Sequence, residues 1–287
     1  MTTKKTFPLF DAPATRREIL ASGARAGGVA AALTMPFISA LPAHARGMKN
    51  ISYGLNTLDI YPAAGGQTAA PILMYVHGGA WRMGSKRKVG SIASYFTKRG
   101  YLVASVGYTL YPSANAEQQA LQVAQAVDWM AVNGGNFGGN GSRIALMGHS
   151  AGCHLSALAS LSGATRRVRA LVCNDTGAYD LAFLSQINSG RIPGLYSALD
   201  RSDKWTKWSP ISYVGNRRQP PTLVMWSGGR NRAAISKHFA DRLQAAGNPV
   251  IRFDGSRYNH ISINSSIGRS ANDPATRAVD DFLGRYL

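Results

Sequence analysis

The sequence predicts an α/β fold built on a mostly parallel, doubly wound sheet. Short apolar runs alternate with longer segments in which apolar residues recur every three to four positions, as strands alternating with helices require. Several of the short runs are continuously apolar, which is typical of strands that are buried on both faces. The chain has 287 residues, of which 45% are hydrophobic, so it is long enough and apolar enough for one large domain of this class.

The expected elements follow one another from residue 51 to residue 286. In chain order they are an opening hairpin (51–53 and 58–62), strand 71–76, helix 91–99, strand 101–106, helix 117–132, strand 143–147, helix 153–159, strand 168–173, strand 222–226, helix 233–246, strand 250–253 and helix 274–286. Residues 179–214, between the sixth and seventh strands, mix glycine, proline and aromatic residues without a clean period. We expect this insert to form a small cap over the strand ends.

The first 45 residues differ from the rest of the chain and predict an export signal. Arg16 and Arg17 precede a weakly apolar stretch over residues 21–41, which is followed by a small-x-small pattern ending at Ala45. Paired arginines before such a stretch resemble a twin-arginine signal. Charged and helix-breaking residues interrupt the stretch, so it falls short of the ~20 apolar residues of a spanning helix. We expect a periplasmic or secreted domain over residues 46–287, without stable membrane insertion after cleavage.

The chain is strongly basic, with a formal net charge of +18. The predicted signal contributes little of it, because residues 1–45 contain five Lys or Arg against two Asp or Glu. A basic balance can indicate nucleic-acid binding, but the basic residues are scattered and form no recognisable nucleic-acid motif. Cys153 and Cys173 fall on predicted core segments, and no Cys/His spacing indicates a metal site. We therefore predict no nucleic-acid partner and no metal.

The pentapeptide Gly148-His149-Ser150-Ala151-Gly152 lies between a predicted buried strand and a predicted helix. A G-x-S-x-G in this context is typical of a nucleophile elbow, a sharp turn that presents the serine hydroxyl. The turn is too tight for side chains on its flanks, so glycines are expected at 148 and 152. Ser150 is therefore the candidate nucleophile.

A serine hydroxyl needs a base at neutral pH, and His260 is the candidate. In this architecture the chain order is serine, acid, histidine, so the base comes late. His260 lies in the loop between the last predicted strand and the closing helix. His238 falls in the middle of a predicted helix, and His149 and His154 are too close to Ser150 in the chain to turn back onto it easily.

Backbone amides beside the nucleophile are candidates for an oxyanion hole. Gly78 and Gly79 follow a central strand and would let their N–H groups approach a substrate closely, and Ala151 offers the amide next to the nucleophile. Trp81, Tyr108 and Tyr111 either line the substrate pocket or pack in the core, and aromatic residues near a sheet edge more often pack. These segments complete the set of groups that acyl transfer needs.

Together these segments resemble the α/β-hydrolase fold. They are His77-Gly78-Gly79-Ala80-Trp81, the elbow with the following Cys153-His154-Leu155, Ser209-Pro210 before Pro220-Pro221, and Asn259-His260. They are most similar to the HGGxW-bearing esterase and arylformamidase-like branch, close to the hormone-sensitive-lipase type, over most of residues 50–287. The resemblance implies a Ser–acid–His hydrolase that acts on small-molecule carboxylic esters or N-formyl amides without a cofactor, and a structural role for His154.

The acid departs from the family pattern. Relatives carry a G-x-x-D after the penultimate strand, and the matching segment Gly228-Gly229-Arg230-Asn231 has Asn231 at the acid position. An asparagine can orient an imidazole but cannot stabilise an imidazolium by charge, and the swap costs ~10⁴ in turnover in a serine protease. Asp175 closes the strand after the elbow helix, on the edge of the sheet where catalytic groups gather. Asn231 and Asp175 both stay open as the third residue, with Asp254 as a further candidate.

The sequence therefore predicts a serine hydrolase that cleaves the carboxylic ester of a small or aryl substrate through an acyl-enzyme on Ser150. One alternative is an arylformamidase-like hydrolase of N-formyl amides. The other belongs to a different class, a hydrolase fold that serves as a catalytically weak binding module, with Asn231 as the sign of its decay. The substrate and the oligomeric state stay open.

Overall fold

An eight-stranded sheet organises residues 47–287, the part of the chain that the computed structural model describes. Its strands are β1 (Met48–Ser52), β2 (Thr57–Tyr61), β3 (Ala70–Val76), β4 (Leu102–Val106), β5 (Gly139–His149), β6 (Val168–Asn174), β7 (Thr222–Ser227) and β8 (Val250–Gly255). They lie in the order β1-β2-β4-β3-β5-β6-β7-β8. β2 pairs antiparallel with β1 and with β4, and the pairs from β4 to β8 are parallel. The predicted hairpin and the mostly parallel sheet are confirmed.

Helices connect the strands and close the chain. Those described are α2 (Ser91–Lys98), α3 (Ala116–Asn133), α4 (Ala151–Leu161), α5 (Leu181–Ile187), α6 (Trp205–Trp208), α7 (Arg230–Ala245), α8 (Ser262–Ser265) and α9 (Pro274–Tyr286). Local sequence starts the longer ones. The Asn115 and Gln118 side chains form a capping box at the start of α3. The Asp273 carboxylate accepts the first free amides of α9, and Pro274 has the fixed φ that suits a first helical position.

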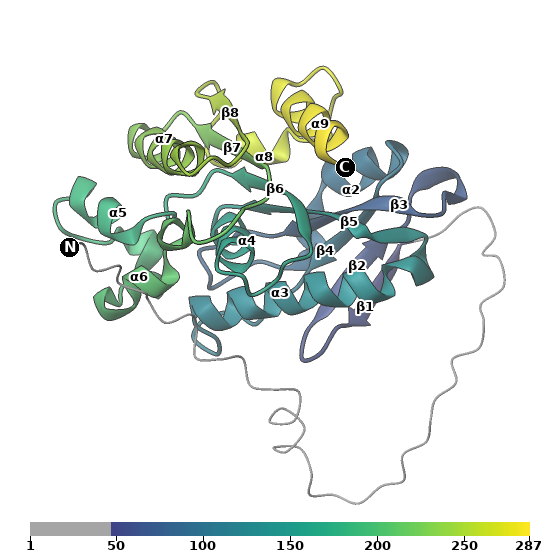
Figure 1. Ribbon diagram of the computed structural model, residues 1–287, viewed down its shortest axis with the longest axis horizontal. Coiled ribbons are helices and arrows are strands. Elements are labelled where there is room, and N and C mark those ends of the chain that lie inside the picture. The colour runs from purple at the N-terminus through teal and green to yellow at the C-terminus, as the bar shows by residue number, and fades with distance from the viewer. Residues whose placement is uncertain (1–46) are drawn as a thin grey trace, which may run out of the picture. The chain divides into compact units, whose positions relative to one another are not determined.

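Each face of the sheet carries its own hydrophobic core. Along β3, Ile72, Met74 and Val76 point into one cluster, and Leu73 and Tyr75 point into the other, as the two-residue period of a strand requires. Buried residues of α3, α4 and α7 complete the first cluster, and those of α2 and α9 complete the second. Figure 1 shows α3 below the sheet and α2 and α9 above it. Because both faces are covered, the strands β3, β4, β6 and β7 are buried along nearly their whole length.

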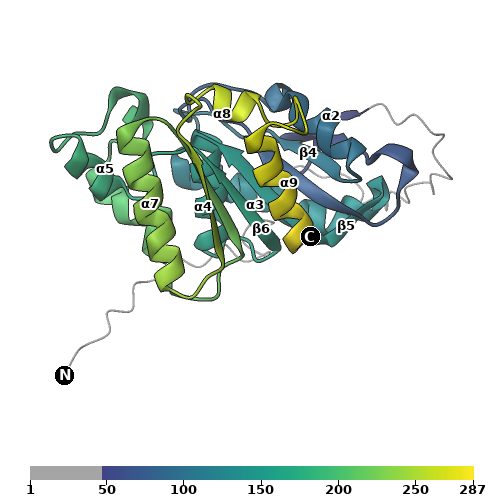
Figure 2. The ribbon, with the colours of Figure 1, turned by 90° about the horizontal axis from the view of Figure 1, so that it is seen from above.

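The insert between β6 and β7, which we call the cap, is built from short helices. It consists of α5, α6 and the 3₁₀ helices η4 (Gly194–Leu199), η5 (Ser202–Lys204) and η6 (Pro210–Tyr213). Figure 2 shows α5 beside α7. The ends of the insert are joined, because the amide of Ile211 donates to the carbonyl of Tyr179 at 3.0 Å and the amide of Leu181 donates to Ser209 Oγ at 3.0 Å. The predicted export signal lies outside the described residues. Within 47–287, no helix is long and apolar enough to cross a membrane.

Two glycines allow α4 to begin against the end of β3. A Cβ on Gly152 would lie 2.1 Å from the carbonyl oxygen of Val76 and 2.4 Å from that of His77. A Cβ on Gly148 would lie 2.2 Å from the carbonyl oxygen of Gly152. The chain can thus turn sharply between β5 and α4 only without side chains at these positions.

Substitution of Gly152 by alanine is expected to destabilise the protein. The added methyl group meets backbone atoms that cannot move away, and overpacking of this kind costs about 1–3 kcal/mol. Chemical denaturation measures the loss. Gly284→Ala is the matched control, because it lies in α9 with nothing within 4 Å of the new Cβ. We expect it to leave the free energy of unfolding unchanged or raise it by up to about 1 kcal/mol. Equal stability of the two variants would contradict the steric account.

Candidate active site

Ser150 lies at the turn where β5 ends and α4 begins. Its backbone has φ 56° and ψ −121°, a region that side chains other than glycine seldom adopt. Such a conformation costs of order 1–3 kcal/mol and persists only where the surroundings enforce it. Here the Ser150 amide donates to the carbonyl of Asn174 at 3.0 Å, and its carbonyl accepts from the amide of His154. The strained turn leaves the Ser150 side chain half-buried at the carboxyl edge of the sheet.

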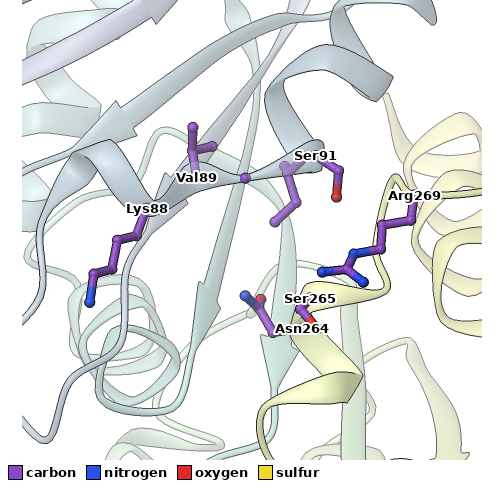
Figure 3. Close-up of a pocket in the computed structure, with 8 residues that line it drawn as sticks. Lys88, Val89, Ser91, Asn264, Ser265 and Arg269 are labelled. Atoms are coloured by element: carbon purple, nitrogen blue, oxygen red, sulfur yellow. The ribbon is translucent and has the colours of Figure 1, made fainter.

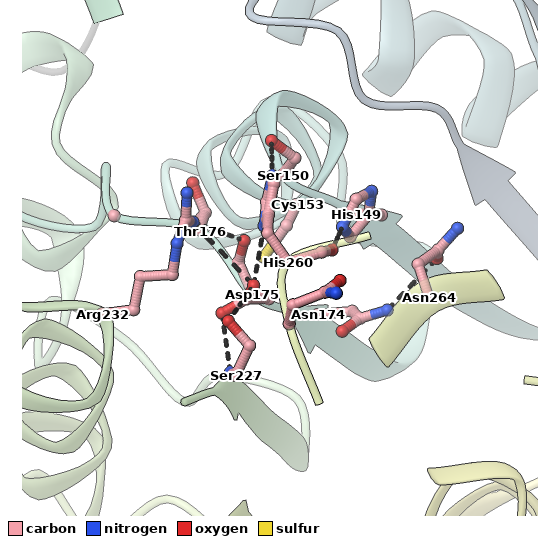
Figure 4. A network of polar contacts seen from close by, with 12 residues as sticks. His149, Ser150, Cys153, Asn174, Asp175, Thr176, Ser227, Arg232, His260 and Asn264 are labelled. Atoms are coloured by element: carbon pink, nitrogen blue, oxygen red, sulfur yellow. Dashed lines mark hydrogen bonds and ion pairs between the residues drawn. The ribbon is translucent and has the colours of Figure 1, made fainter. Parts of the chain in front are cut away.

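His260 joins Ser150 to Asp175. Its Nδ1 lies 2.7 Å from Asp175 Oδ2, and its Nε2 lies 2.9 Å from Ser150 Oγ (Figure 4). An ionised carboxylate can only accept a hydrogen bond, so Nδ1 carries the proton and Nε2 accepts from the hydroxyl. This arrangement gives the hydroxyl a base and gives that base an oriented carboxylate, which is the geometry of a Ser–His–Asp triad.

The turn after β8 holds His260 in place. The Asn259 side-chain oxygen accepts from the amides of Ile261 and Ser262 at 3.0 and 2.8 Å. A local bond of this kind is what makes asparagine favourable in turns. The carbonyl of His260 accepts from His149 Nε2 at 2.8 Å. The backbone of His260 is therefore held in place, while 23% of its side chain stays exposed.

Asp175 is completely buried, and its charge is balanced by specific partners. The Ser227 amide donates to Oδ1 at 2.9 Å, and the Ser227 hydroxyl donates to Oδ2 at 2.7 Å. Arg232 Nη1 lies 3.9 Å from Oδ2 and donates to the Asp175 carbonyl at 3.2 Å. Burial favours the neutral acid, but the bond from His260, the Arg232 charge and the Ser227 bonds outweigh it, so the pKa of Asp175 is lowered. The carboxylate stays ionised.

Asn231 lies away from His260. Its side-chain amide donates to Asn188 Oδ1 at 3.4 Å, on an exposed part of the structure. Because α7 begins at residue 230, Asn231 lies in the first turn of this helix and faces Asn188 at the end of α5. The Asp175 carboxylate is the acceptor for His260 Nδ1 instead. Asp254 is also elsewhere, since its carboxylate accepts from the Ser256 amide in an exposed turn. Of the three open candidates, the structure brings only Asp175 to the imidazole.

The loop after β3 lies directly against the elbow. A Cβ on Gly78 would be 3.0 Å from Ser150 Cβ and 2.8 Å from the His149 carbonyl, so the bare backbone of Gly78 fits beside the serine. Gly79 has φ +132°, and a Cβ there would lie 2.0 Å from the Met83 carbonyl. Ala151 is the first residue of α4, where helical amides have no partner inside the helix. Among the described residues, no hydrogen bond uses the amides of these three residues as donors.

His154 links this loop to the cap. The Trp81 indole donates to His154 Nδ1 at 3.1 Å, and His154 Nε2 donates to the carbonyl of Trp208 at 2.7 Å. An indole can only donate and a carbonyl can only accept, so the ring is neutral. Burial lowers the pKa of His154 to about 4, which agrees with that state. His154 thus holds two walls of the site together, in the structural role that the family resemblance implied.

The aromatic residues of the loop pack rather than open onto solvent. Trp81 is 2% exposed and Tyr108 is 6% exposed. Tyr108 stacks on His77 with ring centroids 4.4 Å apart and donates to the His77 carbonyl at 2.9 Å. Tyr111 is partly exposed, and the Arg82 guanidinium lies 4.2 Å from its ring centroid. The packing interpretation holds for Trp81 and Tyr108.

His149, Asp175 and His260 also form a potential metal-ligand group. One ligand atom of each lies within 4.8 Å of the other two. In this structure those groups are committed to protein hydrogen bonds, from His149 Nε2 to a carbonyl and from His260 Nδ1 to the carboxylate. Burial, and after it the neighbouring His260, lower the pKa of His149 to about 4. The cluster is fully accounted for as a hydrogen-bonded unit around Asp175.

A small pocket of about 190 Å³ lies between the start of α2 and the end of α8. Figure 3 shows the Arg269 side chain extending toward Ser265 and Asn264 across it. Asn264 connects this pocket to the site, because its Oδ1 accepts from Asn174 Nδ2 at 3.2 Å and Asn174 directly precedes Asp175. The polar network behind the triad therefore continues to this pocket.

Ser227 and Arg232 were not anticipated from the sequence. Neither belongs to a recognisable motif, and both act on Asp175 only because β7 and α7 lie beside the end of β6. The sequence offers one indication, for Ser227 alone. This residue ends β7 and directly precedes Gly228, where the segment that carries the family's acid begins.

Comparison with known proteins agrees with this geometry. The BD-FAE family model matches residues 58–237. Isoprenylcysteine alpha-carbonyl methylesterase ICME of Arabidopsis thaliana is 28% identical over 227 residues, 69% of this chain and 53% of that protein. Esterase LipQ of Mycobacterium tuberculosis is 29% identical over 251 residues, 80% of this chain and 59% of that protein. The chain thus spans about half the length of these relatives.

Two further similarities bear on substrate and fold. Kynurenine formamidase of Salmo salar is 32% identical over 117 residues, 40% of this chain and 38% of that protein. A crystal structure of esterase B from Lactobacillus rhamnosis superposes with a TM-score of 0.67 at 18% identity, covering 84% of each chain. At that identity the superposition shows the α/β-hydrolase fold and nothing finer.

The neutral state of His154 predicts a pH-dependent stability. Its folded pKa of about 4 lies below the ordinary 6.5, so between these values the unfolded chain binds a proton that the folded chain does not. The contribution of His154 to the free energy of unfolding should therefore be complete above pH 6.5. This contribution should fall by roughly 3 kcal/mol as the pH approaches 4. Chemical denaturation at several pH values measures the fall, which His154→Gln should reduce. An imidazole that titrates near pH 6.5 by NMR would contradict the assignment.

Proposed function

Because the chain belongs to the BD-FAE family, we propose that it is a serine hydrolase that cleaves the carboxylic esters of small or aryl substrates through an acyl-enzyme on Ser150. The single observation that carries this proposal is the continuous contact from Ser150 Oγ to His260 and from His260 to the buried carboxylate of Asp175. Two relatives named as esterases support the ester as substrate.

His260 serves as base and then as acid. Its Nε2 takes the hydroxyl proton while Ser150 Oγ bonds to the carbonyl carbon of the ester. The imidazolium then gives this proton to the leaving alkoxide, and the acyl group stays on Ser150. A water molecule loses a proton to the same Nε2 and attacks the acyl carbon. Nε2 then returns this proton to Ser150 Oγ as the acyl–oxygen bond breaks, which releases the acid and the free serine. Asp175 keeps its charge throughout and stabilises the imidazolium at 2.7 Å.

The amides of Gly78, Gly79 and Ala151 stabilise the oxyanion of each tetrahedral intermediate. The close fit of Gly78 beside Ser150 and the position of Ala151 at the start of α4 support this assignment. Preorganised amides need no reorientation as the negative charge develops, and one such donor is worth about 2.7–4 kcal/mol in a comparable enzyme.

An arylformamidase-like activity is the second candidate. An N-formyl amide presents the same carbonyl chemistry to Ser150, with an amine as leaving group that His260 Nε2 protonates. The specific observation in its favour is the similarity to a kynurenine formamidase. Hydrolysis of an N-formylarylamine in parallel with an aryl ester separates the two candidates by their relative kcat/KM.

The central test is ester hydrolysis by four proteins. Wild type should hydrolyse p-nitrophenyl acetate or butyrate, and Ser150→Ala should lose this turnover. Asp175→Asn should lower kcat on the order of 10⁴, because the uncharged amide favours the wrong tautomer of His260 and cannot stabilise its cation.

Asn231→Ala is the matched control, since it alters the residue at the family's acid position but lies away from His260. We expect its turnover to stay within a few-fold of wild type. If Asn231→Ala loses activity and Asp175→Asn keeps it, the assignment of the acid is wrong. A folded wild type with no turnover on esters or formamides would favour the binding-module alternative.

We also propose that the protein is exported through a twin-arginine-type signal and acts in the periplasm or outside the cell. The basis is the Arg16-Arg17 pair followed by the apolar stretch and the pattern ending at Ala45. Expressed in a bacterium with this export route, wild type should be found outside the cytoplasm with its mass reduced by residues 1–45. Replacement of both arginines by lysine should leave full-length protein in the cytoplasm. Equal export of both forms would overturn the proposal.

A further inference from the structure

A second, larger pocket lies at the amino ends of the parallel strands, whereas Ser150 lies at their carboxyl ends. It has a volume of about 580 Å³ and lies where β6 and β7 begin. Its polar lining includes Thr165, Arg166, Arg169, Arg217, Arg218 and Gln219. The seven residues of β6, at about 3.3 Å each, separate this end of the strand from Asp175 by about 20 Å. The arginine pocket, as we name it after these four arginines, is therefore distinct from the ester site.

The protein offsets the positive charge of the arginine pocket only in part. Among the described residues, no ion pair joins any of the four arginines to a carboxylate. The carboxylate of Asp128 reaches this region, but it accepts from Thr165 Oγ1 at 2.6 Å instead. Burial, and after it the charge of Arg166, lower the pKa of the half-buried Arg217. Four like charges thus lie close together without a direct ion-pair partner.

Backbone contacts hold part of the cluster in position. Arg169 Nε donates to the carbonyl of Ser142 at 3.1 Å, and Arg217 Nη2 donates to the carbonyl of Ser160. These bonds use neutral acceptors, so they fix the two guanidinium groups without offsetting their charge. Arg166 and Arg218 are exposed, and within residues 47–287 neither side chain makes a hydrogen bond, unlike those of Arg169 and Arg217. Their donors remain available to a ligand.

We propose that the arginine pocket binds an anion that carries two or more linked phosphate groups. Guanidinium groups match phosphate oxygens with paired hydrogen bonds. The four positive charges of the pocket also exceed the single negative charge of the nearby Asp128 carboxylate. Two or more linked phosphates carry several negative charges on one ligand, as a pocket lined by four arginines favours. Because the pocket is about 20 Å from Asp175, the bound anion leaves the ester site accessible and serves to hold the protein on a phosphate-bearing molecule.

Calorimetric titration of the full-length protein with inorganic pyrophosphate tests the proposal. Wild type should bind pyrophosphate, and should bind inorganic phosphate more weakly. The double variant Arg166→Ala with Arg218→Ala should bind pyrophosphate at least about tenfold more weakly, since it loses the two unengaged donors.

The double variant Lys98→Ala with Arg277→Ala is the control, because it removes the same two charges from exposed helical positions elsewhere. Its affinity should stay within about twofold of wild type, as additivity of distant sites implies. Unchanged thermal unfolding shows that both variants are folded. Absence of pyrophosphate binding by wild type, or equal weakening in the two double variants, overturns the proposal when the vesicle measurement below is also negative.

Vesicles distinguish a soluble ligand from a lipid headgroup. Wild type is mixed with phosphatidylcholine vesicles that contain or lack cardiolipin, a lipid with two linked phosphates. Sedimentation with cardiolipin that the arginine variant loses and the control variant retains supports the pocket and identifies the headgroup as its source. Pyrophosphate binding without sedimentation supports the pocket and a soluble ligand. Failure of both measurements refutes the proposal, whatever the outcome for ester hydrolysis.

Discussion

The hydrogen bond from His260 Nδ1 to the buried carboxylate of Asp175 is the interaction on which the rest of the site depends. It fixes the proton on Nδ1 and so leaves Nε2 to accept from Ser150 Oγ. A completely buried carboxylate is costly unless it is paired and hydrogen-bonded. Ser227 and Arg232 provide those contacts, and they come from the end of β7 and the start of α7. The carboxyl ends of β5, β6, β7 and β8 lie next to one another in the sheet. This arrangement brings the residues at and after those ends together and so assembles the triad.

A neutral histidine stabilises the surroundings of this triad. His154 accepts from the Trp81 indole and donates to the Trp208 carbonyl, so one side chain of α4 joins the Gly78-Gly79 loop to the cap. A charged imidazole could not accept from the indole, and the low pKa of His154 keeps that bond intact over the physiological range. The loop, the elbow and the cap are consequently held as one unit around the serine. This rigidity is what the proposed oxyanion amides require.

The sequence predicted the fold and Ser150 because their signals are local, and it predicted His260 from the chain order of this architecture. The alternation of apolar runs with helical periods determines the doubly wound sheet, and the elbow motif between a strand and a helix marks Ser150. The choice between Asp175 and Asn231 could not be made in this way. It depends on the positive φ of Asp175 at the end of β6 and on where α7 begins, and no short pattern encodes either. The arginine pocket was equally hidden, because its two arginine pairs are about fifty residues apart and appeared as scattered charge.

Covalent labelling with a fluorophosphonate tests the central claim most directly, because the reagent reacts with a serine only when a neighbouring base activates it. Mass spectrometry locates the adduct, and the rate of labelling reports on the His260–Asp175 contact. The account predicts one adduct on Ser150, formed on the order of 10⁴ more slowly in Asp175→Asn, and at the wild-type rate in Asn231→Ala. An adduct on another residue, or labelling of Asp175→Asn as fast as wild type, would contradict it.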